Sequence, residues 1–207
     1  MLKMNLIVTV VLVALLSSYS NATITADPLA QQLVENNYKS LNTSAFVGQY
    51  ISTSNPSIAS VDVRIFNGLI GADITLNIFG APAENANPAG SLSLLGSTTV
   101  AFATNDNTIS SRFDFEGVGG VDVSGFEDKR IFLEFSTSGG GELGSRVPGN
   151  YTGGYLYSST DGGTSWGLDQ HSLAFSVRTS DPTLPEPATL GLLGLGGGMF
   201  LMRRRQA

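Results

Sequence analysis

The sequence predicts an all-β protein, an antiparallel β-sandwich of the jelly-roll type. Three observations support this fold. Apolar and polar residues alternate in short runs, as in strands with one buried face. Glycine is abundant (25 residues), and turn signals recur between the runs. Charged residues make up 14% of the chain, and the helices that a parallel sheet would need between its strands are missing.

The strength of the alternation varies along the chain. It is clearest at residues 61–65, 74–78 and 131–135, and in the last of these runs Phe132 and Glu134 fall on the other face. Further strands are expected at residues 92–104, 113–115, 121–123, 155–157 and 173–177. The proline- and glycine-rich segments 81–90 and 138–150 are expected as loops. About eight to ten short strands result, which is typical of a sandwich.

The first 22 residues have the pattern of a cleaved signal peptide. Lys3 supplies positive charge, residues 6–16 are apolar except for Thr9, and small polar residues follow up to residue 22. Small side chains at Ser20 and Ala22 place the expected cleavage between Ala22 and Thr23. The apolar run is shorter than the roughly 20 residues that span a bilayer, which favours a cleaved signal over a membrane anchor. Four parts are predicted, namely a signal peptide (1–22), a lead-in segment (23–44), the β-sandwich domain (45–180) and a tail with its linker (181–207).

The lead-in segment is weakly patterned. Asp27-Pro28 favours the start of a short helix with Leu29, Leu33 and Val34 as its apolar face. A flexible lead-in is the alternative.

The charge balance excludes some partners. Residues 23–186 hold seven basic and 17 acidic residues, a net charge of −10. This opposes binding to nucleic acid and to anionic lipid surfaces. With no cysteine, the chain has neither a disulfide framework nor a thiolate metal site. A structural calcium ion held by loop carbonyls stays open, although Asp122, Glu127 and Asp128 lack the spacing of an EF-hand.

The tail combines three features. Pro185-Glu186-Pro187 is followed by an apolar run at residues 188–202 that contains five glycines, and then by Arg203, Arg204 and Arg205. As a helix the run would be about 22 Å long, against a hydrocarbon core of about 30 Å. It could still span if the arginines snorkelled, and these would stay on the cytoplasmic side.

This arrangement closely resembles the PEP-CTERM sorting signal of Gram-negative bacteria. The resemblance covers about 24 residues and coincides with an N-terminal signal peptide. It implies export by signal peptidase and the export machinery, with transient insertion in the inner membrane. It also implies recognition near Pro185-Glu186-Pro187 by an exosortase, a membrane-embedded cysteine protease or transpeptidase. The product would reach the cell surface or an extracellular polysaccharide matrix.

A weaker resemblance covers the middle of the chain. The stretches Val47–Tyr50, "SIASVDVRIF", "YTGGYLYSSTDGGTSW" and "LAFSVRT" look like the extracellular β-sandwich modules called choice-of-anchor domains. Such modules mostly lack an assigned activity. The resemblance therefore implies a fold and a location but no reaction.

The segment "SSTDGGTSW" resembles an Asp-box, with Ser159, Asp161, Gly163 and Trp166 at its defining positions. The expected structure is a hairpin turn in which the aspartate accepts backbone hydrogen bonds, the glycines take positive φ and the tryptophan packs beneath. One copy predicts a structural turn rather than a glycosidase propeller.

No residue is assigned to catalysis, to a metal or to a cofactor. Asp114 and Glu116 fall on one face of a strand and could pair as glycosidase carboxylates, but alternating acids on a solvent-facing strand explain them as well. His171 is the only histidine, and Asp169 beside it does not make a Ser-His-Asp triad.

The favoured hypothesis is a non-enzymatic surface or matrix protein that binds extracellular polysaccharide. Stacking surfaces could come from Tyr151, Tyr155, Tyr157 and Trp166, of which Trp166 is expected beneath its turn. Two alternatives stay open. One is a glycoside hydrolase or lyase, and the other is a structural matrix component without a ligand.

Overall fold

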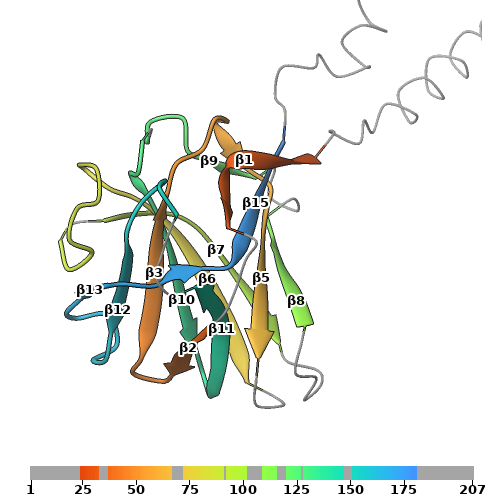
Figure 1. Ribbon diagram of the computed structural model, residues 1–207. Helices are drawn as coiled ribbons and strands as arrows, with labels where there is room; N and C mark the ends of the chain where they lie inside the picture. The colour runs from red at the N-terminus through yellow and green to blue at the C-terminus, as the bar shows by residue number, and fades with distance from the viewer. Residues whose placement is uncertain are drawn as a thin grey trace, which may run out of the picture. The chain divides into compact units, whose positions relative to one another are not determined.

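The structure, a computed structural model, confirms an all-β fold of antiparallel sheets (Figure 1). It describes residues 24–32, 37–66, 72–90, 92–101, 109–115, 120–126, 128–146 and 151–180. Every strand pair in these ranges is antiparallel, as in the predicted jelly-roll sandwich. The predicted signal peptide and the predicted apolar helix of the tail lie outside the described residues.

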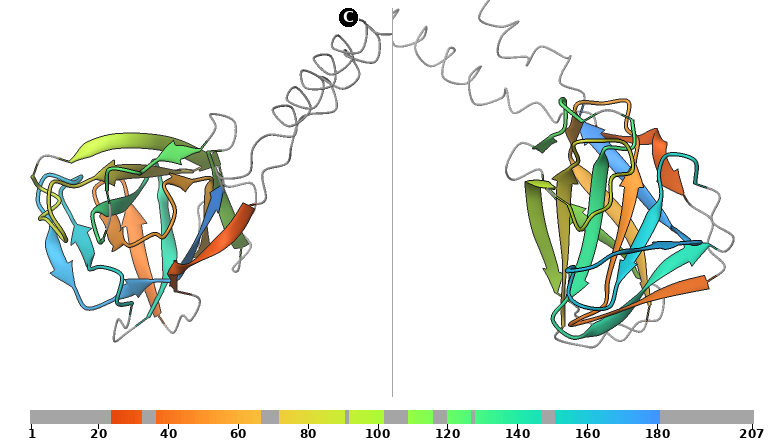
Figure 2. Two further views of the ribbon diagram at one scale, coloured as in Figure 1. Left: turned by 90° about the horizontal axis from the view of Figure 1, so that it is seen from above. Right: turned by 90° about the vertical axis from the view of Figure 1, so that its left-hand side faces the viewer.

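One layer is a seven-stranded sheet (Figures 1 and 2). Its main path runs through β1 (Ile24–Gln32), β15 (Phe175–Ser180), β5 (Ser60–Phe66), β11 (Gly140–Arg146) and β14 (Ser172–Leu173). In addition, β2 (Asn37–Asn42) pairs with β11, and β8 (Ile109–Asp114) pairs with β5.

The other layer is a six-stranded sheet. Its order is β13 (Gly167–Asp169), β12 (Leu156–Ser159), β3 (Phe46–Ile51), β10 (Ile131–Thr137), β6 (Asp73–Gly80) and β7 (Ser93–Ala101). A short two-stranded ribbon is formed by β4 (Ser57–Ile58) and β9 (Val121–Asp122). The loops next to this ribbon form the pocket described below.

The main core lies between the two sheets. Strands β5, β6 and β10 alternate as predicted, and their inward side chains, among them Val61, Ile74 and Leu133, are fully buried. A buried glutamine, Gln49, sits among them. It donates to the carbonyls of Tyr50 and Gly154 and accepts the Leu173 N–H, so its polar atoms are satisfied.

A second apolar cluster covers part of the outer face of the six-stranded sheet. Tyr50, Phe132, Ala81 and Trp166 form its buried centre. The ring of Phe132 lies over Gly48 on the neighbouring strand, where a Cβ atom would stand 2.0 Å from the ring. Phe132 therefore points away from the main core, as its alternation predicted, yet is 0% exposed.

The segment 23–44, expected as a lead-in, contains two strands of the seven-stranded sheet. β1 pairs with β15 at residues 24–26 and 31–32, with a register shift between them. Pro28 falls within that shift, so its missing N–H interrupts no ladder. The ladder is supplied by a strand more than 140 residues away, which weak local patterning could not reveal.

The segment 138–150 is not wholly a loop, as its glycines had suggested. Residues 140–146 form β11, which pairs with β2, β5 and β14. The strand has little side-chain signal, since Leu143 is its one large apolar residue. Its neighbours on both sides provide the hydrogen bonds that hold it extended.

Candidate functional site

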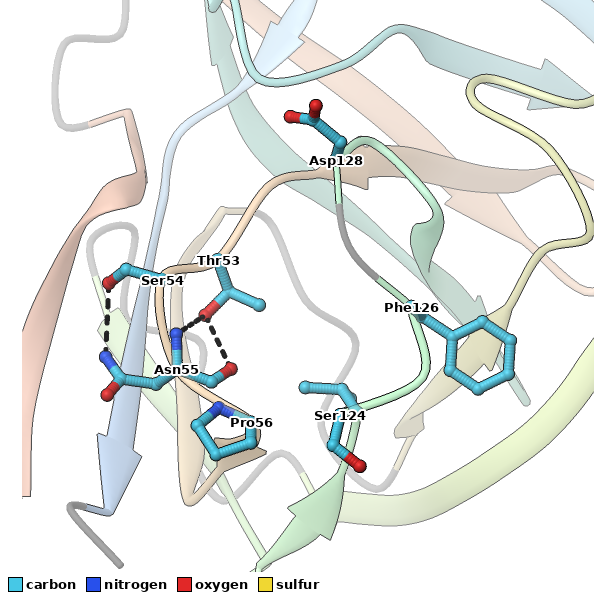
Figure 3. A pocket seen from close by; sticks show the side chains of 8 residues that line it. Thr53, Ser54, Asn55, Pro56, Ser124, Phe126 and Asp128 are labelled. Atoms are coloured by element: carbon cyan, nitrogen blue, oxygen red, sulfur yellow. Dashed lines mark hydrogen bonds between the residues drawn. The ribbon is translucent and has the colours of Figure 1, made fainter. Parts of the chain in front are cut away.

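A pocket opens between two loops at one end of the domain (Figure 3). One loop follows β3, and the other joins β9 to β10. The cavity volume is about 510 Å³, and the lining residues are Thr53, Ser54, Asn55, Pro56, Val123, Ser124, Phe126 and Asp128. We call this cavity the loop pocket. Its volume lies within the roughly 300–1,000 Å³ of small-ligand sites.

Backbone contacts hold the two loops together. The Val123 N–H donates to the Pro56 carbonyl at 2.7 Å, next to the pairing of β4 with β9. At the other end, the Lys129 N–H donates to Ser52 Oγ at 3.2 Å. The loop pocket is thus framed by hydrogen bonds at both ends before any ligand binds.

Each loop is also shaped by local side-chain bonds. Thr53 Oγ1 accepts the Asn55 N–H at 3.1 Å, and Asp122 Oδ1 accepts the Ser124 N–H at 2.9 Å. Both are turns in which a short polar side chain replaces a backbone partner. They fix the direction in which Asn55 and Ser124 leave the backbone.

Asp128 and Lys129 both have left-handed backbone conformations, with φ of 51° and 59°. This conformation is costly for residues other than glycine, although aspartate tolerates it better than most. The surroundings hold it in place, because the Asn85 N–H donates to the Lys129 carbonyl at 2.9 Å and Lys129 Nζ pairs with Glu84 at 3.0 Å. Such strain is common at binding sites.

The lining combines polar groups with a rigid apolar wall. Hydroxyls come from Thr53, Ser54 and Ser124, an amide from Asn55, and a carboxylate from Asp128. Figure 3 shows Asp128 at one end of the loop pocket and Pro56 and Ser124 at the other. The ring of Phe126 packs on Gly80, where a Cβ atom would come within 2.3 Å of it. The site can therefore offer several directed hydrogen bonds beside an apolar surface.

The Asp-box segment forms a tight turn after β12. Asp161 accepts hydrogen bonds from the Ser159 hydroxyl and from the Ser165 backbone and hydroxyl. The bonds from Ser165 and Ser159 hold the pKa of Asp161 at about 2. Gly162 and Gly163 have φ of 69° and 84°. Trp166 Nε1 donates to the Gly163 carbonyl at 2.9 Å, and its ring meets Phe132 edge-on.

The aromatic residues considered for stacking do not form one platform. Tyr151 packs edge-on against Phe175 with ring centroids 5.2 Å apart, whereas Tyr157 packs against Tyr50. Trp166 is 9% exposed beneath its turn, but Tyr155 is 57% exposed. None of the four lines the loop pocket.

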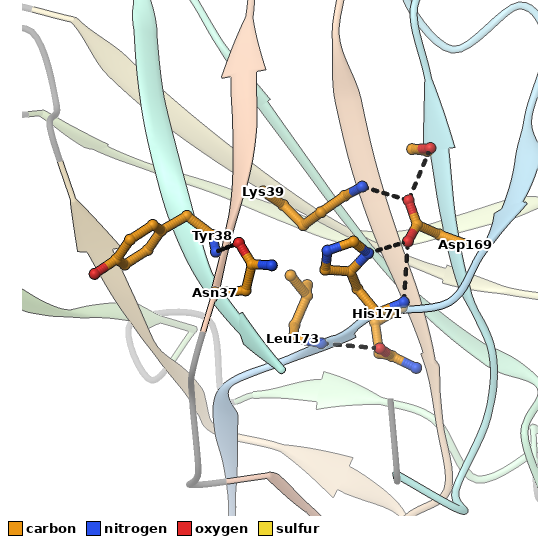
Figure 4. Close-up of polar contacts among 8 residues, drawn as sticks. Asn37, Tyr38, Lys39, Asp169, His171 and Leu173 are labelled. Atoms are coloured by element: carbon orange, nitrogen blue, oxygen red, sulfur yellow. Dashed lines mark hydrogen bonds and ion pairs between the residues drawn. The ribbon is translucent and has the colours of Figure 1, made fainter. Parts of the chain in front are cut away.

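His171 belongs to a polar cluster around Asp169 (Figure 4). The Asp169 carboxylate contacts Lys39 Nζ and His171 Nδ1, and it accepts a bond from the Ser158 hydroxyl at 3.3 Å. Lys39 lies on β2 and Asp169 on β13, so the contact joins the two sheets. Within the described ranges, no hydroxyl is bonded to the other ring nitrogen of His171, so the cluster lacks a triad nucleophile.

We expect this cluster to make stability depend on acid pH. Burial raises the pKa of Asp169, but hydrogen bonds from Lys39 and His171 outweigh it and hold the pKa at about 2, below the ordinary 3.8. The ionised carboxylate therefore stabilises the fold at neutral pH, by on the order of 1 kcal/mol, and this stabilisation is lost as pH falls from about 4 to 2.

In urea unfolding, Asp169→Asn should destabilise the protein at pH 7, and its unfolding free energy should differ less from that of the wild type near pH 2. Asp73→Asn, at an exposed acid, is the control. An undiminished difference at low pH would contradict this account.

The other candidate acids are dispersed. Asp114 is exposed on β8 opposite Ser60, and its expected partner Glu116 lies outside the described residues, as does Glu127. In the described part of the chain, no three Asp, Glu or His side chains gather as a metal site. Three further predicted sites lie outside the described residues. They are the cleavage site at Ala22 and Thr23, the motif Pro185-Glu186-Pro187, and the arginines Arg203, Arg204 and Arg205. No helix among the described residues is long and apolar enough to cross a membrane.

Sequence reasoning missed most of the loop pocket. Asn55-Pro56 and Asp122-Val-Ser-Gly are turn signals that could have marked two loops. Nothing in either segment indicates that loops about 70 residues apart converge. Asp128 was considered, but only as a calcium ligand.

The fold and the loop pocket define a β-sandwich module that suits an extracellular protein. The family model described as the PEP-CTERM protein-sorting motif matches residues 183–206. The chain therefore carries the PEP-CTERM signal, which indicates an exported protein that is sorted by exosortase toward the cell surface. No curated protein matches the chain by sequence.

Among solved structures, the chain is similar to the cysteine protease and lectin-like domains of Cwp84, a surface layer associated protein of Clostridium difficile. The identity is 12% and the TM-score is 0.37. The match covers 71% of this chain and 36% of that one, so the chain spans about a third of that structure's length.

Proposed function

We propose that the chain is a non-enzymatic surface or matrix protein whose β-sandwich binds polysaccharide in the loop pocket. The observation that carries the binding proposal is the preformed cavity of about 510 Å³ with hydroxyl, amide and carboxylate groups around it. The sorting motif at residues 183–206 supports the destination at the cell surface.

The chemistry of the lining suits a sugar. Sugar hydroxyls both donate and accept, and the hydroxyl of Ser124 and the amide of Asn55 can do the same. A carboxylate such as Asp128 accepts strong hydrogen bonds from hydroxyls. Pro56 and Phe126 add apolar surface that can contact the C–H groups of a sugar ring.

Binding without cleavage is favoured by the number of carboxylates. Glycoside hydrolysis by the usual route needs two carboxyl groups about 5–9.5 Å apart around the bond. Of the described residues that line the loop pocket, Asp128 is the one acid. This supports a binding module over a glycoside hydrolase.

The tail would act only during sorting. In this proposal, residues 188–202 stop in the inner membrane with Arg203, Arg204 and Arg205 on the cytoplasmic side. Exosortase then acts near Pro185-Glu186-Pro187 and transfers or releases the β-sandwich at the surface.

The test is calorimetric titration of the mature protein with exopolysaccharide fragments from the producing cells. We expect saturable binding with no change in fragment length. Ser124→Tyr, which fills the loop pocket, should lower affinity about tenfold or more, whereas Ser93→Tyr on exposed β7 should not. Shortened fragments would support the enzyme alternative, and no binding to any fragment would support a structural component. Either result would overturn the proposal.

A further inference from the structure

We infer that the loop pocket selects uncharged or positively charged saccharides and excludes those that carry carboxylate or sulfate groups. This inference rests on the proposed function and adds the chemical class of the ligand. It follows from the charges around the loop pocket and from how the nearest cations are occupied.

Among the described residues that line the loop pocket, the one charged side chain is acidic. Asp128 contributes a carboxylate, and none of the lining residues is Lys, Arg or His. Within the described part of the chain, no side chain donates a hydrogen bond to the Asp128 carboxylate. Its oxygens are therefore available to hydroxyl or ammonium groups of a ligand.

The nearest cations are committed elsewhere. Lys129, the next residue, pairs with Glu84 at 3.0 Å, and this pairing, with a smaller contribution from Asp128, raises the pKa of Lys129. Arg130 donates from Nε to the Ala81 carbonyl at 3.0 Å and lies over the ring of Phe126. Both residues thus serve to hold the 81–85 loop against the segment that carries Asp128.

The backbone fixes the point from which the Asp128 side chain leaves the chain. The left-handed conformations at residues 128 and 129 are held by Ser52 on one side and Asn85 on the other. The Asp128 carboxylate therefore stays at this end of the loop pocket. A ligand carboxylate there would meet a like charge, while the neighbouring Lys129 is paired with Glu84, and this repulsion costs binding energy.

The experiment compares three sets of oligosaccharides of equal length, namely neutral glucans, glucosamine oligomers and uronate oligomers, each titrated into the mature protein. We expect the neutral and amino sugars to bind at least about tenfold more tightly than the uronates. Asparagine at position 128 keeps the shape of the side chain and tolerates the left-handed backbone. Asp128→Asn should therefore reduce the ratio of neutral-sugar affinity to uronate affinity severalfold. Asp73→Asn changes the net charge equally but at a distant exposed site, and it should leave the ratio unchanged.

Two outcomes would overturn the inference. One is equal or tighter binding of uronates by the wild type. The other is an equal effect of Asp73→Asn and Asp128→Asn, which would assign the selection to the net charge of the chain. Failure of all three sets to bind would instead overturn the proposed function, so the two failures are distinguishable.

Discussion

Replacing Phe132 with alanine should destabilise the domain by about 3–5 kcal/mol. The ring is fully buried in the outer cluster, with ring centroids 4.8 Å from Tyr50 and 5.4 Å from Trp166. Its removal leaves a cavity that a sheet and a tight turn cannot easily close. Chemical denaturation of the purified protein measures the loss of unfolding free energy. The matched control is Phe79→Ala, because Phe79 is partly buried and lies opposite Phe132 on the neighbouring strand.

Gly48 provides an independent check of the same packing. A Cβ atom there would stand 2.0 Å from the Phe132 ring, which is too well buried to move aside. Gly48→Ala should therefore cost about 1–3 kcal/mol alone, but much less in the background of Phe132→Ala, where the ring is gone. Additive effects, or a Phe132→Ala cost no larger than that of Phe79→Ala, would show that the ring does not lie over Gly48.

Replacing Pro185-Glu186-Pro187 with three alanines should abolish processing of the tail. Proline favours an extended backbone at the residue before it and lacks an N–H donor, and the glutamate gives this segment one charge in an otherwise uncharged stretch. Alanines favour continuation of a helix and present none of these features. Mass spectrometry of protein from cells with a working exosortase should find the wild type without the residues beyond the motif, and the variant with them.

Pro182→Ala is the matched control, because Pro182 lies just outside the matched residues 183–206. That variant should be processed like the wild type. A triple-alanine variant that reaches the surface with its tail removed would contradict the role assigned to the motif.

The sequence was most informative where a feature is local. Alternation at Val61, Ile74 and Ile131 predicted β5, β6 and β10, because a strand with one buried face imposes that pattern directly. The sorting motif at residues 183–206 is likewise a contiguous signal. Neither inference needs to know which distant segments meet.

It was least informative where distant segments supply the stabilising contacts. β11 is extended because β2 and β5 pair with it, although its glycines favour a loop. Phe132 was placed on the outer face, but its burial depends on the Asp-box turn and on the segment around Ala81, which cover it. The loop pocket depends on the convergence of the loops at Asn55 and Ser124, which turn signals alone cannot predict.

We propose that saccharide binds between the two loops of the loop pocket. The most direct measurement is a nuclear magnetic resonance titration of the mature protein with a neutral oligosaccharide that binds it. We expect the largest amide shifts at residues 53–55 and 123–126, and at Asp128. Shifts confined to the outer face of the six-stranded sheet, around Tyr155 and Leu168, would contradict this proposal and place the saccharide on the exposed aromatic and apolar side chains there.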